Sequence, residues 1–157
     1  MPQAERWLTK SEPGDYSIDD LARDGSTHWD GVRNYQARNF IRDAMAKGDL
    51  ALFYHSNCDE PGIAGIAEIS KPGYPDPSQF DENHRYYDAK SDPEEPRWFS
   101  FDAKWKRKFK IFVHLKELKA NARLADMKVV QRGQRLSIQP VAKKEWNEVC
   151  KMGGVTP

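Results

Sequence analysis

Two continuous apolar runs that lie close together in the chain constrain its fold more than any other feature. Residues 50–55 and 63–69 are each long enough for a strand, and a turn-forming segment, 56–61, separates them. A run without polar alternation is typical of a strand that is covered on both faces. Gly62 and Gly65 allow a close approach of neighbouring backbone. The pattern predicts two neighbouring strands near the centre of a sheet.

Two further strands are expected on either side of this pair. Residues 6–9 are expected to form a short first strand near the start of the chain. Residues 99–105 alternate apolar and polar side chains, which predicts a strand with one buried face. The segment 74–96 is rich in proline and acidic residues and lacks periodicity. We therefore expect it to be a long surface excursion and not a linker between domains.

Capping residues predict short helices between these strands. Ser17 precedes a helix that Gly25 ends, and Asn34 precedes a second helix that Gly48 ends. A short helix near 115–119 and a final helix over 142–150 are also expected. Strands interleaved with several short helices predict an α+β domain with a strongly curved, mixed sheet.

Length and composition limit the possible classes of protein. A chain of 157 residues fits one domain, 1–157, around a single core. Cys58 and Cys150 lie far apart, which predicts neither a disulfide framework nor a thiolate metal site. Residues 1–6 hold no signal-peptide run, and no apolar segment approaches the roughly 20 residues needed to cross a bilayer. These features predict a cytoplasmic protein without a membrane partner.

The net charge of +1 hides a strong separation of charge along the chain. Residues 97–123 hold nine Lys or Arg and two acids, whereas residues 76–95 hold seven acids and two bases. The basic stretch could follow a phosphate backbone while the acidic one faces away. The alternative is that both stretches are solvated surfaces.

The segment 29–39 combines an aromatic side chain, a turn, two arginines and three side-chain amides. Recognition of one base requires a flat apolar face, polar groups on the edge of the base and cations for the phosphates. Trp29 precedes the turn-forming pair Asp30-Gly31, so its indole would either stack on a base or cover one end of the core. Asn34 would either cap the helix that follows or hydrogen-bond a base.

This segment resembles the EVE family, as do Tyr54-His55-Ser56 and residues 136–141. The resemblance covers the chain from about Trp7 to about Val149 and implies a PUA-like pseudo-barrel related to the YTH and ASCH domains. It also implies a monomeric binding domain for one modified base, such as 5-methylcytosine, in RNA, in modified DNA or in a free nucleotide. The pocket residues that it implies are Lys10, Ser11, Trp29, Val32, Asn34, Tyr54, His55, Ser56, Ser137 and Gln139.

Cations near these segments are candidates for phosphate contacts. Arg33 and Arg38 flank the second helix, and the others lie in the basic stretch or just before Ser137. Each of them also fits an ordinary solvated position. The candidates are Arg33, Arg38, Lys106, Arg107, Arg132 and Arg135.

Two rival functions are weighed against a base-binding domain. Some ASCH-type domains resemble amidohydrolases of modified cytidines, and Lys10, Ser11 and Glu12 offer a base, a hydroxyl and an acid. Neighbouring strand residues point to opposite faces, however, so Lys10 and Ser11 are not expected in one cavity. The second rival is an adaptor that binds protein through its basic stretch.

A metal site and a nucleotide-cofactor site are not expected. His55 and Cys58 supply half of a zinc site, but no second half lies at a usable spacing. The sequence also lacks a glycine-rich phosphate loop of the dinucleotide or P-loop type. We therefore predict no metal and no cofactor.

Overall fold

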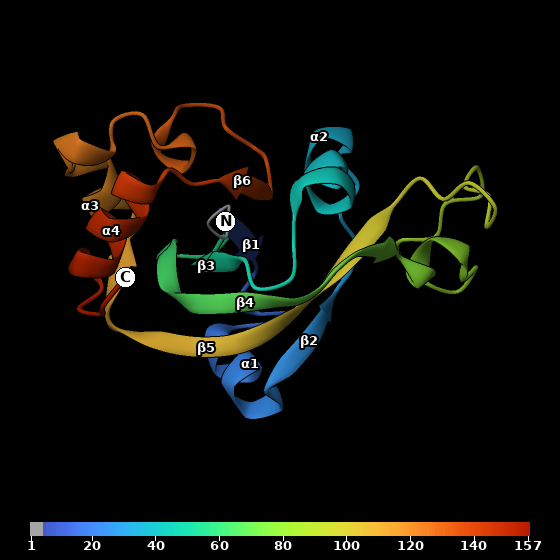
Figure 1. Cartoon of the computed structure of the whole chain (residues 1–157), viewed down its shortest axis with the longest axis horizontal. Coiled ribbons are helices and arrows are strands. Elements are labelled where there is room, and N and C mark those ends of the chain that lie inside the picture. The colour runs from blue at the N-terminus through green and yellow to red at the C-terminus, as the bar shows by residue number, and fades with distance from the viewer. Residues whose placement is uncertain (1–4) are drawn as a thin grey trace.

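A six-stranded, curved sheet organises the chain (Figure 1). The computed structural model describes residues 5–157. Strand order across the sheet is β2-β5-β4-β3-β1-β6, with β1 and β3 parallel and the other neighbours antiparallel. The predicted mixed α+β sheet is confirmed, and it is open, because within the described residues β2 and β6 form its two edges. The strands are β1 (Arg6–Ser11), β2 (Ser26–Trp29), β3 (Leu50–His55), β4 (Gly62–Pro75), β5 (Phe99–His114) and β6 (Ile138–Pro140).

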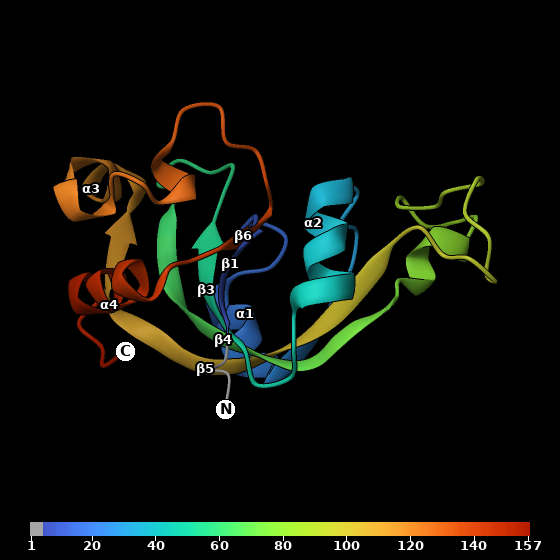
Figure 2. The same cartoon turned by 45° about the horizontal axis from the view of Figure 1, so that its top comes forward.

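The helices are short and lie at both sides of the sheet (Figure 2). Ser17 caps the first of them through Asp20 N, and Gly25 ends it at φ +80°, as the sequence predicted. The second is shorter than predicted, since it passes into a π-helical turn and stops at Met45, before Gly48. The helices are α1 (Ile18–Asp24), α2 (Tyr35–Asn39), α3 (Leu115–Ala120) and α4 (Lys143–Met152), with a π-helix at Phe40–Ala44 and 3-10 turns at Pro77–Phe80, Ala122–Leu124 and Lys128–Val130.

Two buried clusters lie on opposite faces of the sheet. Trp7 and Phe53 belong to one cluster, whereas Leu8 and Leu52 belong to the other, so the alternation of side chains along β1 and β3 divides the core. The first cluster packs against α1 and α2, and the second against α3 and α4. Both faces of the central strands are covered, which explains the continuous apolar runs.

Glycine permits the close approach of β4 to its neighbours. A Cβ on Gly62 would overlap backbone atoms of Val113 and His114, and one on Gly65 would overlap the carbonyl of Arg107 and the side chain of Ile18. The expected role of both glycines is therefore confirmed.

The predicted alternation along β5 holds only in part. Phe101 and Ala103 are fully buried, as expected, but Trp105 is 37 % exposed. Trp105 lies one residue beyond the last β2–β5 pair, Ser26–Lys104, where the sheet loses its neighbouring strand. Ser100, predicted to face solvent, is buried.

The excursion predicted for 74–96 lies at residues 76–98, between β4 and β5, and Figure 1 shows it projecting from one end of the long hairpin. It is nevertheless well ordered around a buried amide. Gln79 donates from Nε2 to the carbonyls of Asp76 and Trp98, at 2.7 and 2.8 Å, and its Oε1 accepts from Trp98 N. The excursion is thus fixed to the sheet by its own hydrogen bonds.

Cys58 and Cys150 are free thiols. In residues 5–157, no helix has both the length and the apolar character needed to cross a bilayer. The predicted lack of a signal peptide concerns residues 1–6, of which 1–4 lie outside the described residues.

Candidate functional site

A cleft of about 650 Å³ opens where β1 and β2 end, within the size range of small-ligand sites. The turn after β1, Ser56 after β3, the excursion and the segment before β6 also contribute to its walls. Its lining residues are Lys10, Ser11, Glu12, Asp15, Tyr16, Thr27, His28, Trp29, Asp30, Ser56, Arg85, Tyr86, Arg135 and Ser137.

Trp29 is the large aromatic residue on which the predicted site depends. It is the last residue of β2, and it is half-buried. Its indole stacks on Phe101, with ring centroids 5.6 Å apart and planes 16° apart, and meets Phe53 edge to face at 5.5 Å. Because the same indole borders the cleft, the core supports the ring while part of it remains open to a ligand.

Five of the ten predicted pocket residues line this cleft: Lys10, Ser11, Trp29, Ser56 and Ser137. Lys10 and Ser11 both do so, contrary to the expectation that neighbouring strand residues would face apart. They are the last two residues of β1, and the cleft lies across the end of that strand. Ser11 Oγ donates to the carbonyl of Tyr16 at 2.6 Å, and Ser56 N donates to the carbonyl of Ser11 at 2.9 Å.

Three of the other predicted pocket residues have structural roles outside the cleft lining. Val32 is a core residue, 5 % exposed. Asn34 caps α2, where its Oδ1 accepts from Ala37 N at 3.0 Å, which is one of the two roles considered for it. Gln139 is 1 % exposed and donates from Nε2 to the carbonyl of Leu136 at 2.9 Å. Alternation along an extended segment predicts that Gln139 lies on the polar face with Ser137, opposite Ile138, but Ile138 and Gln139 are both buried in β6.

Tyr54 and His55 also lie outside the cleft lining. Tyr54 is buried beside a neighbouring groove, and burial raises the pKa of its hydroxyl to about 12. His55 Nε2 accepts from Ile18 N at 3.2 Å, at the start of α1. Burial lowers the pKa of His55, which keeps the imidazole neutral and able to accept this bond.

The predicted phosphate contacts divide into two groups. Arg135 lines the cleft, and Arg132 lines the neighbouring groove. Arg33 instead pairs with Asp76 and donates to the carbonyl of Tyr86 at 2.7 Å, and Arg38 donates to the carbonyl of Arg97 at 2.7 Å. Both arginines therefore bind the acidic excursion to α2.

Lys106 and Arg107 lie away from the cleft on β5. Lys106 Nζ lies 3.5 Å from Glu68, and Arg107 donates to the carbonyl of Thr156 at 3.1 Å near the end of the chain. Neither residue is among those lining the cleft.

The cleft also contains residues that the sequence did not single out. Arg85 and Tyr86 come from the excursion, which was expected to face away from any nucleic acid. The group His84-Arg85-Tyr86-Tyr87, basic and aromatic within an acidic segment, was the signal that could have revealed them. Asp30, in the turn after β2, also lines the cleft, and its side chain is 35 % exposed.

Charges of both signs meet in the cleft. The carboxylates are those of Glu12, Asp15 and Asp30, whereas the cations are Lys10, Arg85 and Arg135. Burial lowers the pKa of Lys10 from its ordinary value. Such a cleft can pair with donors on a ligand and with a phosphate at the same time.

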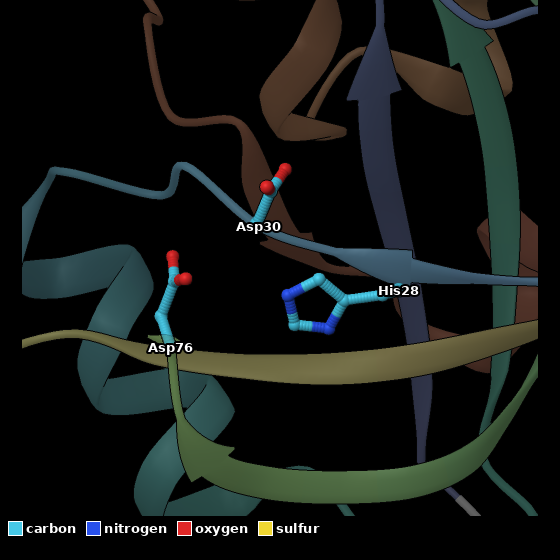
Figure 3. Close-up of side chains that lie close together, drawn as sticks. All are labelled: His28, Asp30 and Asp76. Carbon is cyan, nitrogen blue, oxygen red and sulfur yellow. The ribbon is translucent and has the colours of Figure 1, made fainter. Parts of the chain in front are cut away.

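His28, Asp30 and Asp76 form a compact group at the cleft edge (Figure 3), with one ligand atom from each within 4.8 Å of the others. A histidine with two carboxylates could hold a metal ion. Both oxygens of Asp76, however, already accept hydrogen bonds, and the Arg33 guanidinium lies 3.0 Å away. His28 Nδ1 is hydrogen-bonded to the Tyr74 hydroxyl. The positive charge of Arg33 disfavours a metal cation at the same carboxylate.

Comparisons with known proteins agree with this architecture. Residues 5–152 match the EVE domain family. The chain is 44 % identical to thymocyte nuclear protein 1 of Homo sapiens over 168 residues, which cover 95 % of this chain and 74 % of the relative. A solved structure of human THYN1 protein in complex with 5-methylcytosine-containing DNA has a TM-score of 0.90, at 43 % identity over 98 % of this chain and all of that one.

A more distant likeness extends the fold to another class of domain. The YTH domain of Zygosaccharomyces rouxii MRB1, solved in complex with N6-methyladenosine RNA, has a TM-score of 0.55 at 14 % identity. It covers 100 % of this chain and 91 % of that one. This likeness concerns the fold alone and supports the predicted PUA-like architecture.

Proposed function

Because this chain belongs to the EVE domain family, we propose that it binds one base of a nucleic acid, or of a free nucleotide, in the cleft at the ends of β1 and β2. The observation that carries the proposal is the position of Trp29, which stacks on Phe101 in the core and borders the open cleft. A fixed aromatic face of this kind contributes about 1–3 kcal/mol to stacking on a base.

The base is proposed to carry an exocyclic amino group. Of the two amides predicted to contact it, Asn34 caps a helix and Gln139 is buried, so carboxylates and hydroxyls remain as edge-reading groups. A carboxylate only accepts hydrogen bonds, which suits the amino group of cytosine or adenine and disfavours the carbonyl of uracil or thymine. Asp30 is the best placed of these groups, since it follows Trp29 directly and its side chain is partly exposed.

A modified cytosine is the specific ligand that we propose. The relative solved with 5-methylcytosine-containing DNA is 43 % identical to this chain and has the same fold. An added methyl group in an apolar contact contributes only about 0.8 kcal/mol. The cleft would therefore prefer the modified base moderately and would not exclude the unmodified one.

Substitution of Trp29 tests the proposal. Trp29→Ala should weaken binding of 5-methylcytidine by roughly 5- to 150-fold, which corresponds to the loss of about 1–3 kcal/mol of stacking. Trp105→Ala is the matched control, because Trp105 is exposed on β5 and outside the cleft lining. Titration calorimetry gives the affinities, and circular dichroism checks that each variant is folded. Equal affinities for the folded Trp29→Ala variant and the wild type would contradict the proposal.

An amidohydrolase of modified cytidines is the alternative that the cleft keeps open. Lys10, Ser11 and Glu12 all line it. Ser11 Oγ, however, donates its proton to the Tyr16 carbonyl, and Glu12 Oε1 accepts from Asn57 Nδ2 at 2.9 Å. These bonds leave no base aimed at the hydroxyl proton, so we favour binding without catalysis. Incubation with N4-acylated cytidines separates the two functions. Released cytidine would support the enzyme, whereas saturable binding without product would support the base-binding domain.

Four further expectations belong to this proposal. We propose that residues 1–157 act as one EVE domain, as a monomer, without a bound metal or cofactor. We also propose a cytoplasmic location, which the two free cysteines fit. Size-exclusion chromatography with light scattering and imaging of a tagged protein would test the oligomeric state and the location.

A further inference from the structure

A second groove of about 650 Å³ adjoins the cleft. One wall is formed by residues of α3 and the other by residues 129–134. These run from the 3-10 turn Lys128–Val130 into the loop that rises beside α3 and returns to β6 (Figure 2). Tyr54 of β3 also lines the groove. The charged residues that line it are all cations, Lys10, Lys119 and Arg132, and no carboxylate is among its lining residues.

Lys10 connects the groove with the cleft, because it lines both. It occupies the end of β1, where its backbone N donates to the carbonyl of Ser137 at 2.9 Å. Its Nζ lies 5.9 Å from the centre of the Tyr54 ring. Burial lowers the pKa of Lys10 from its ordinary value, because removal from water disfavours the charged ammonium group.

The cations of this region form no ion pairs within the described part of the chain. Among residues 5–157, no carboxylate lies within ion-pair distance of Lys10, Lys119, Arg132 or Arg135. Two cations of β5 differ in this respect. Lys106 pairs with Glu68 and Lys108 pairs with Asp19 at 2.8 Å. An anion would therefore gain more in the groove than beside Lys106 and Lys108.

We propose that this groove binds the phosphate next to the base held in the cleft, so that a nucleic-acid strand passes from the cleft over Lys10 into the groove. Lys119 and Arg132 contact the phosphate in the groove, and Arg135 lies where the strand leaves the cleft. The inference rests on the proposed base-binding function and makes it more specific, because it identifies the ligand as a strand and not a free nucleoside. It also replaces the basic stretch of β5 as the path of the backbone.

A double variant tests the groove separately from the cleft. Lys119→Gln with Arg132→Gln removes two exposed cations, and Lys106→Gln with Lys108→Gln is the matched control on β5. Binding of 5-methylcytidine and of a single-stranded hexanucleotide with one central 5-methylcytosine is measured by titration calorimetry, at about 50 and 200 mM salt.

The groove variant should bind the nucleoside with unchanged affinity and the hexanucleotide about tenfold more weakly at low salt. The slope of log K against log salt concentration should become shallower by about 0.7, because contact with one phosphate of a single strand is lost. The control should change neither value. An unchanged hexanucleotide affinity in the groove variant, or an equal loss in the control, would overturn the groove as the phosphate site.

The outcomes for the two proposals are distinct. If wild-type protein binds neither nucleoside nor hexanucleotide, the proposed function and the inference both fail. If Trp29→Ala weakens nucleoside binding but the groove variant leaves hexanucleotide binding intact, the base-binding proposal stands and only the groove is wrong.

Discussion

Arg33 and Asp76, 43 residues apart in the sequence, form an ion pair of 3.0 Å that joins the start of α2 to the beginning of the acidic excursion. The Asp76 side chain is fully buried and that of Arg33 is 22 % exposed. The guanidinium also lies over the rings of Tyr86 and Trp98, at 5.3 to 5.4 Å from their centres. Because Tyr86 lines the cleft, this pair holds one wall of the candidate site in place.

Loss of Arg33 should therefore destabilise the protein strongly. Arg33→Met leaves a buried carboxylate without its cation, and we expect the free energy of unfolding to fall by on the order of 3 kcal/mol. Arg42→Met is the control, because the Arg42–Asp43 pair is exposed and should contribute less than about 1 kcal/mol. Denaturant unfolding followed by tryptophan fluorescence measures both. Equal decreases in the free energy of unfolding in the two variants would show that the buried pair stabilises the protein no more than the exposed pair does.

Gly31 should be intolerant of a side chain for two separate reasons. It has φ +78°, and a Cβ there would overlap the ring of Tyr86. The left-handed backbone alone costs an alanine roughly 1–2 kcal/mol. Gly48→Ala isolates that cost, since Gly48 has φ +94° and open space around its Cβ position.

We expect Gly31→Ala to lower the free energy of unfolding by more than Gly48→Ala does. It should also weaken binding of 5-methylcytidine, because the displaced Tyr86 ring lines the cleft. Thermal and denaturant unfolding give the stability, and titration calorimetry the affinity. Similar stability losses in the two variants would mean that the Tyr86 ring moves aside without cost.

Local signals in the sequence were sufficient for much of the fold. The β3–β4 pair follows from its apolar runs, and α1 follows from Ser17 and Gly25, because capping depends on a few consecutive residues. Strand β2 could not be predicted in this way. Its four residues have no apolar alternation, and they are extended because they pair with residues 101–104 of β5.

The position of a candidate site residue was predictable where local sequence limits its environment. Trp29 is a large aromatic residue directly before a turn, and it borders the cleft. Gln139 and Arg33 carry polar groups that suit either a ligand or a buried partner. Arg33 pairs with Asp76, which is distant in the sequence, so tertiary packing sets its partner. Gln139 bonds the nearby carbonyl of Leu136, because its side chain is buried in the fold.

His55 should make the stability depend on pH. Its folded pKa is lowered by burial, while the unfolded chain titrates near the ordinary value of about 6.5. As pH falls below about 7, His55 becomes protonated in the unfolded chain before it does in the folded protein. The free energy of unfolding therefore decreases with falling pH until the folded pKa is reached, by up to about 1.4 kcal/mol per pH unit. The Ile18 N–H then loses its acceptor when His55 is finally protonated.

The variant His55→Gln retains a possible acceptor but does not titrate. We expect it to show a smaller pH dependence of unfolding between about pH 7 and 5. Denaturant unfolding at several pH values gives the difference. Parallel curves for wild type and variant would exclude His55 as the titrating group.

Asp30 should determine which bases the cleft accepts. Its carboxylate accepts from the amino group of cytosine but repels the O4 carbonyl of uracil, whereas an asparagine can donate to that carbonyl. Asp30→Asn should therefore reduce the preference for 5-methylcytidine over 5-methyluridine by about tenfold, which lies within the roughly 1–3 kcal/mol expected for one base-reading contact. The change should preserve the fold, because the Asp30 side chain is partly exposed and lies 3.7 Å from His84 Nε2, beyond hydrogen-bond distance. Asp126→Asn, outside the cleft lining, is the matched control and should leave the ratio of the two affinities unchanged. If Asp30→Asn lowers both affinities equally, its charge attracts the ligand without reading the base edge.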